Sequence, residues 1–160
     1  MKRALALALT LVIAGCGLPT EPENELSEAR ARWVGVGLVS YSFQYSLSCF
    51  CGGPANLPLI IEVVNGEITR AWNLNGLEPL DPSLLTSLHT IPELFEIAER
   101  ALREADDHQL RYDEFYGYPT TMEIDWILNA IDDEQRYQSS CLGAASGDPA
   151  ASHPCFAPPP

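Results

Sequence analysis

Hydrophobic and polar residues alternate with a period of two along residues 41–51, a pattern typical of a long, half-buried β-strand. A second apolar run, residues 59–64, leads directly into Asn65-Gly66. Asparagine and glycine both tolerate the positive φ angles of a type I′ turn. The sequence therefore predicts a β-hairpin, in which residues 67–73 form the returning strand.

Two other segments have the spacing of amphipathic helices. Apolar residues recur three or four positions apart from Glu25 into residues 34–39, and again along residues 91–105. Thr90 and Glu93 precede the second run in the arrangement of a capping box, in which each residue bonds the other's backbone N–H. The segment before it, residues 75–88, contains two prolines and is expected to be a loop.

The second half of the chain returns to strand patterns, at residues 110–115, 121–126 and 134–142. The order is therefore a helix, three strands, a second helix and three more strands. Strands joined as hairpins beside amphipathic helices indicate an α+β fold. We expect an antiparallel sheet of about six strands built from hairpins, with two helices packed on one face.

The first sixteen residues have a different character. Lys2 and Arg3 precede an apolar stretch, residues 5–13, that is too short to span a bilayer and is followed by Gly15-Cys16. Residues 13–16, Ile-Ala-Gly-Cys, resemble the lipobox of bacterial lipoproteins, in which the signal peptide is cut before a cysteine that carries the lipid. The resemblance implies lipid attachment at Cys16 and a location in the cell envelope, outside the cytoplasm.

These features divide the chain into four parts. Residues 1–15 are expected to be a lipoprotein signal peptide, and residues 16–24, rich in proline and glutamate, a flexible tether. Residues 25–142 carry the α+β domain. Residues 143–160 are rich in proline, alanine and serine and are expected to be disordered, because they contain too little apolar surface to bury.

Charge limits the partners that such a protein can bind. The chain has 22 acidic against 9 basic residues and a formal charge of −13. Nucleic acids and anionic lipid headgroups are bound through clustered Lys and Arg, so both are unfavourable ligands here. Metal cations and basic partners remain compatible with this charge, which also keeps an exported domain soluble.

Four cysteines remain besides Cys16, and an exported chain favours their oxidation to disulfides. We expect that Cys49 pairs with Cys51 or lies beside it unbridged, and that Cys141 pairs with Cys155. A bridge from Cys49 or Cys51 to Cys141 is the competing arrangement. Alternatively, Cys49 and Cys51 project from the same face of a strand and serve in thiol redox chemistry or in binding a soft metal such as Cu(I).

Two further clusters have simple structural explanations beside their functional ones. Tyr116 and Tyr118 flank a glycine in a turn and are candidates for a binding surface, or they pack around that turn. The acidic groups at residues 113–114 and 132–134 could bind calcium, but they lack the spacing of an EF-hand loop.

The sequence contains no recognisable catalytic motif and no motif that predicts a cofactor. We therefore expect a non-enzymatic binding or interaction module. Its partner would be an envelope protein or a small ligand, besides the membrane reached through the N-terminal lipid.

Several motifs together resemble an uncharacterised family of small bacterial lipoproteins, known only as a domain of unknown function. The motifs are Trp33, Tyr41, Cys49-Phe50-Cys51, Val63-Val64-Asn65-Gly66, Thr90-Ile91 with Leu94-Phe95, Tyr112-Asp113, Tyr116-Gly117-Tyr118-Pro119, Ile124-Asp125 and Asp132-Asp133-Glu134. The resemblance spans residues 26–142 and implies a shared fold and an exported or lipid-anchored setting. It implies no activity and no catalytic residue, and none of the motifs that carry it contains Cys141 or Cys155.

Overall fold

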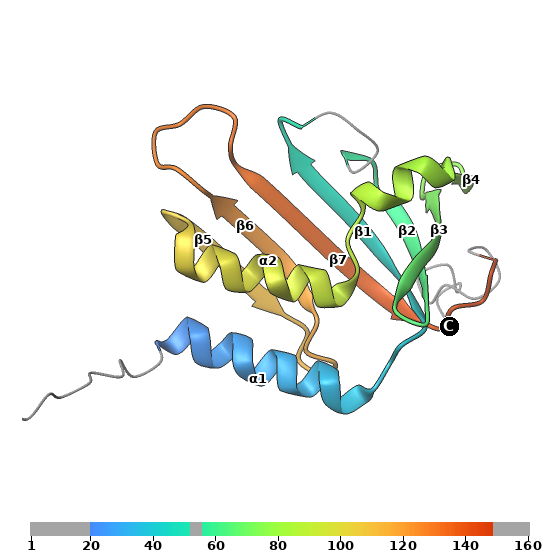
Figure 1. Ribbon diagram of the computed structural model, residues 1–160, viewed down its shortest axis with the longest axis horizontal. Coiled ribbons are helices and arrows are strands. Elements are labelled where there is room, and N and C mark those ends of the chain that lie inside the picture. Colours follow the sequence, from blue (N-terminus) through green and yellow to red (C-terminus); the bar gives the residue numbers. More distant parts are fainter. Residues whose placement is uncertain (1–19, 52–55, 149–160) are drawn as a thin grey trace, which may run out of the picture.

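One β-sheet extends through the domain and organises the rest of the fold (Figure 1). The computed structural model describes residues 20–51 and 56–148. Its seven strands follow the order β4-β3-β2-β1-β7-β6-β5, and all neighbours are antiparallel. The strands are β1 (Tyr41–Cys49), β2 (Leu59–Val64), β3 (Glu67–Asn73), β4 (Glu78–Pro79), β5 (Asp107–Tyr112), β6 (Pro119–Asp125) and β7 (Gln135–Gly143).

The expected α+β class and antiparallel sheet are confirmed, with one strand more than the approximate six. Each half of the chain contributes a helix followed by three consecutive strands: α1 (Glu21–Val36) with β1, β2 and β3, and α2 (Ile91–Glu104) with β5, β6 and β7. The halves meet where β1 pairs with β7, in a register that runs from Ser42 opposite Gly143 to Cys49 opposite Gln135.

Both helices begin with the same four-residue pattern, Thr-x-Pro-Glu. At α2 the Thr90 side chain accepts from the Glu93 N–H, and the Glu93 carboxylate accepts from the Thr90 N–H at 2.6 Å. At α1 the Glu23 carboxylate likewise accepts from the Thr20 N–H at 2.6 Å. The capping box expected at Thr90 is therefore confirmed, and its counterpart at Thr20 begins α1 four residues before the expected start at Glu25.

The hydrophobic core lies between the helices and one face of the sheet (Figure 1). Alternate residues of β1 point into it and are buried: Tyr41, Phe43, Tyr45 and Leu47. The Ile91 N–H at the start of α2 donates to the Tyr41 hydroxyl at 3.1 Å. Burial raises the pKa of Tyr41 to about 12, so its hydroxyl stays protonated at physiological pH.

The opposite face of the sheet carries no helix (Figure 1). Its side chains on β1, β7 and β6 are mostly small and polar. They are Ser42, Gln44, Ser46, Ser48, Thr121, Glu123, Arg136, Gln138 and Ser140. We call this surface the open face.

Residues 144–148 cross part of the open face, although the sequence predicts disorder from residue 143. The Glu62 carboxylate, with only 3% of the residue exposed, accepts from the N–H groups of Ser146 and Gly147 at 3.1 and 2.5 Å. Arg70 donates to the Gly147 carbonyl at 3.1 Å. These hydrogen bonds hold the segment as far as residue 148 without an apolar core of its own, and composition could not reveal them.

The expected loop at residues 75–88 also contains short regular elements. It includes β4 and a 3₁₀-helix, η2 (Pro82–Ser87), whose first turn is capped by Asp81 through a 2.8 Å hydrogen bond from the Ser83 N–H. Prolines therefore mark the starts and edges of short elements here, since Pro79 lies on the edge strand and Pro82 in the first turn of η2.

The turn between β5 and β6 packs directly against α1 at Gly117. This glycine has a positive φ of 82°, and a Cβ atom placed there would lie 2.1 Å from the Ala29 carbonyl oxygen. Tyr118, which follows it, is buried and makes an edge contact with Trp33, with ring centroids 6.5 Å apart. The glycine thus brings the turn close enough for Tyr118 to reach the core.

We predict that Gly117→Ala lowers the free energy of unfolding by about 1–3 kcal/mol, because it combines an unfavourable φ with a backbone clash. Gly35→Ala is the matched control: Gly35 lies in α1 with nothing within 4 Å of the added Cβ, so alanine should be neutral or stabilising. Urea unfolding of both variants measures the difference. Equal stability of the two variants would show that the Gly117 contact is not needed.

Candidate binding site

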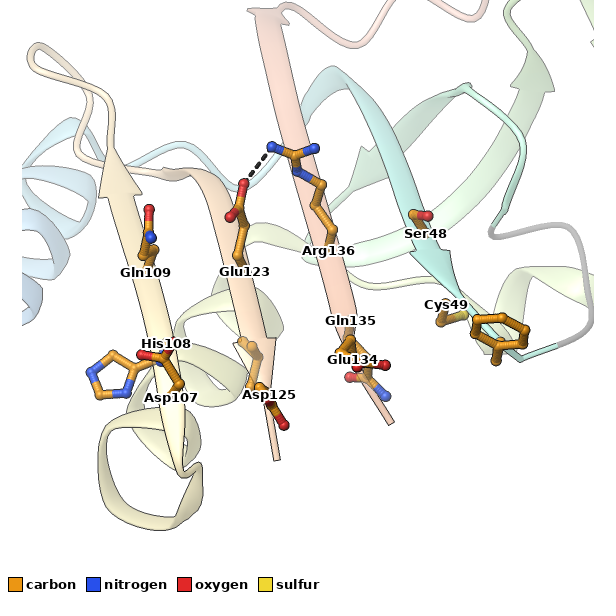
Figure 2. A pocket seen from close by; sticks show the side chains of 12 residues that line it. Ser48, Cys49, Asp107, His108, Gln109, Glu123, Asp125, Glu134, Gln135 and Arg136 are labelled. Carbon is orange, nitrogen blue, oxygen red and sulfur yellow. Dashed lines mark hydrogen bonds and ion pairs between the residues drawn. The ribbon is translucent and has the colours of Figure 1, made fainter. Parts of the chain in front are cut away.

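A hollow of about 450 Å³ lies on the open face at the end of the sheet where β1 and β6 finish and β5 and β7 begin. Figure 2 shows its side chains, which come from these four strands and from Phe50 and Glu134 beside them. The lining residues are Ser48, Cys49, Phe50, Asp107, His108, Gln109, Glu123, Ile124, Asp125, Glu134, Gln135 and Arg136. In Figure 2 an ion pair between Glu123 and Arg136 crosses one side of the hollow.

The loop between β6 and β7 stands beside this hollow and exposes three aliphatic side chains. Ile127, Leu128 and Ile131 are 61%, 58% and 86% exposed; we call them the apolar tip. Two carboxylates fix the loop backbone: Asp133 accepts from the Ile127 N–H and Asp106 from the Leu128 N–H, each at 2.7 Å. These hydrogen bonds therefore keep three apolar side chains exposed to water, and this exposure destabilises the folded protein.

The neighbouring β1–β2 connection adds exposed apolar surface at the same end of the sheet. Phe50 is 78% exposed and Leu57 42%. On either side of Phe50 in the sequence, Cys49 and Cys51 have their sulfur atoms in close contact and their Cα atoms 5.1 Å apart. The Asn56 side chain donates to the Cys51 carbonyl at 2.7 Å, so this corner is braced by both contacts.

Acidic groups surround the apolar tip without enough cations to balance them. We call Asp106, Asp107, Asp125, Asp133 and Glu134 the acidic rim. Desolvation raises the pKa of Asp125, and the nearby charges of Asp133, Glu134 and Asp106 raise it further. One carboxylate oxygen of Asp125 is buried without a hydrogen-bond partner. The negative charges at this end of the sheet therefore repel one another.

The structure places the predicted site residues in different parts of the molecule. Cys49 and Cys51 lie together, and Cys49 lines the hollow. Cys141 is near the far end of β7 and is disulfide-bonded. Its expected partner, Cys155, lies outside the described residues, as does Cys16. The pairing of Cys141 with Cys155 stays a prediction.

The two tyrosines of the β5–β6 turn have different environments. Tyr118 is buried against Trp33, so it does not contribute to an exposed binding surface, whereas Tyr116 is 44% exposed. Asp113 is explained by the same turn, because its side chain accepts from the N–H groups of Phe115 and Tyr116. Within residues 20–51 and 56–148, no three His, Cys, Asp or Glu side chains are grouped so as to hold a metal ion.

Sequence reasoning missed the apolar tip, which lies between the strands expected at residues 121–126 and 134–142. The available signal was three aliphatic residues within a segment otherwise rich in Asn and Asp. This pattern indicates a binding surface only when the exposure of the three side chains is known. Neither helix in the described part of the chain has the length and apolar composition needed to cross a membrane.

Comparison with known proteins identifies the family of this domain. A model of a family of unknown function, DUF6174, matches residues 25–143. The chain belongs to this family. No curated protein and no solved structure matches the chain. The family resemblance seen in the sequence is confirmed as that of an uncharacterised domain, and the lipid-anchored setting stays a prediction.

We predict that Asp125→Asn raises the melting temperature at pH 7. Because the folded-state pKa of this acid lies above its unfolded value, its ionised form destabilises the folded protein at neutral pH, and this penalty disappears as the pH falls through the folded-state pKa. The stabilisation by asparagine should therefore vanish near pH 3. Thermal unfolding at both pH values measures it, with Glu67→Gln, an exposed acid at the opposite end of the sheet, as the control. A gain that is independent of pH would contradict electrostatic crowding as its cause.

Proposed function

We propose that this protein is a lipoprotein of the bacterial cell envelope, anchored to a membrane through a lipid on Cys16. The order of basic, apolar and small residues before Cys16 supports this assignment. The matched family domain begins at residue 25, after this segment. One acyl chain contributes about 0.8 kcal/mol per buried methylene, and more than one chain is needed for a durable anchor.

We propose further that the domain is a non-enzymatic module that binds a partner protein. The observation that carries this proposal is the apolar tip, which is exposed beside a hollow and surrounded by the acidic rim. Apolar side chains at the centre of a contact, with charges at its edge, are the usual anatomy of a protein interface. The charge of the rim selects a partner with a basic surface around an apolar centre.

We propose that Cys49 and Cys51 form a structural disulfide that shapes the edge of this site. Thiol redox chemistry or soft-metal binding at this pair is the alternative. A reactive cysteine needs a positive environment that stabilises its thiolate. The charged side chains that line the hollow with Cys49 are four acids and a single arginine, Arg136, which is paired with Glu123. This environment favours the structural role.

We predict that Cys16→Ser releases the protein from membranes into the aqueous phase. The substitution removes the thiol that carries the lipid and leaves the domain unchanged. Detergent phase partitioning of envelope fractions compares the variant with the wild type. If the wild type enters the aqueous phase to the same extent as the variant, the protein has no lipid anchor.

The binding surface can be mapped in the envelope by replacing Leu128 with a photoreactive phenylalanine analogue. We predict a covalent adduct with a protein of basic surface, reduced at least about fivefold by Glu134→Lys, which reverses one charge of the rim. The matched control places the same analogue at Phe115, which is 81% exposed in the β5–β6 turn at the opposite end of the sheet. Glu114→Lys is the control for charge.

Two results would contradict the proposed surface. One is an adduct formed equally well from position 115, because exposure alone would then explain it. The other is an adduct at position 128 that does not respond to Glu134→Lys, because the acidic rim would then play no part. Neither result depends on the lipid anchor, since the Cys16→Ser experiment measures that separately.

A further inference from the structure

Among the residues that the structure describes, the strand β5 forms one edge of the sheet and pairs only with β6. The backbone groups along its outer side therefore have no strand partner. Such an edge is a template for an added strand, and proteins whose edges must stay unpaired usually protect them by charge, proline or a covering element. β5 contains six residues and no proline, and its residues alternate between exposed and half-buried.

The charges on β5 are complementary to a second copy of the same strand. Asp107, Gln109 and Arg111 point to the open face. In an antiparallel pair centred on Gln109, Asp107 of each copy lies opposite Arg111 of the other, and Gln109 faces its own counterpart. Opposite charges directly across a strand pair stabilise it, and like charges destabilise it. Neither Asp107 nor Arg111 belongs to an ion pair among the described residues.

The other face of β5 contains polar atoms that lack a partner. His108 Nδ1 and the Tyr112 hydroxyl are both buried without a hydrogen bond within the described part of the chain. Beside Tyr112, a hollow of about 450 Å³ lies between β5 and α1, lined by Glu25, Glu28 and Arg32 of the helix and by Leu110, Arg111 and Tyr112 of the strand. Buried polar atoms are normally satisfied, so these two atoms and the adjoining space mark the edge as incomplete.

From these observations we propose that β5 pairs with β5 of a second copy and so forms a symmetric dimer with a continuous sheet. The twofold axis of such a pair is perpendicular to the sheet. Both helical layers therefore lie on the same side, together with the N-terminus of each α1. This arrangement lets two N-terminal lipids enter one membrane, although the pairing itself does not require the lipid.

Charge exchange tests the pairing in the secreted Cys16→Ser protein. We expect a reversible dimer in sedimentation equilibrium, weakened at least about tenfold by Asp107→Arg or by Arg111→Asp, because each change places like charges opposite each other twice in the dimer. The double variant restores both pairs with exchanged signs and should return to within a few-fold of the wild type. A wild type that stays monomeric at 0.5 mM, or a double variant as weak as the single ones, would overturn the proposal.

A second experiment uses the lipidated protein in membranes. Gln109→Cys places a thiol opposite its own counterpart on the twofold axis, so mild oxidation should give covalent dimers in high yield. The control, Gln138→Cys, carries an exposed thiol on the open face of β7, away from this edge, and should give none above background. Equal yields would indicate random collision. The sedimentation experiment uses the purified protein alone, so its outcome does not depend on whether a basic partner binds at the apolar tip.

Discussion

The pairing of β1 with β7 joins the two halves of the domain, and every other layer of the structure depends on it. Each half alone is a helix with a three-stranded meander, and strands in a small meander can bury only one face against one helix. Pairing residues about 100 positions apart is entropically expensive, but it creates a wide sheet on which both helices pack. The inward side of β1 then supplies the largest buried side chains, Tyr41, Phe43 and Tyr45.

The same pairing divides the sheet into a structural face and an accessible face. On one side, aromatic rings of β1 contact one another, and Trp33 of α1 meets Tyr41 edge-on at 5.3 Å. On the other side, serine, threonine and glutamine leave a surface that neither helix covers. Because the core is complete without the loops at the end of the sheet, these loops are free to carry groups that destabilise the fold. The crowded acids and the apolar tip are of that kind.

Much of the fold could be predicted from local patterns, and the reason is physical. Period-two and helical spacing depend on neighbouring residues, so both helices, the Asn65-Gly66 hairpin and the Thr90 capping box were accessible from sequence. Strand order was not, because the central pairing of β1 with β7 is long-range. The start of α1 and the ordered residues 144–148 were missed, since the capping contact at Thr20 and the acceptor at Glu62 outweigh the composition of those segments.

The candidate site was less predictable than the fold, because exposure decides the role of its residues. Tyr118 and Phe115 lie three residues apart in one turn, yet Tyr118 is buried and Phe115 is 81% exposed. The difference arises from Gly117, which brings the turn against α1. Aliphatic residues are usually interpreted as core residues, and the apolar tip has three of them: Ile127, Leu128 and Ile131. They are exposed because two carboxylates bind the backbone of their loop.

The proposed anchor also limits how the domain can be oriented. Only four residue steps separate Cys16 from Thr20, the cap of α1, and an extended chain spans at most about 3.6 Å per residue. The start of the helical layer would then stay within about 14 Å of the lipid attachment point. The open face lies on the other side of the sheet from these helices. A domain held so closely by its helical layer would therefore present the hollow to the aqueous compartment, where a basic partner can reach it.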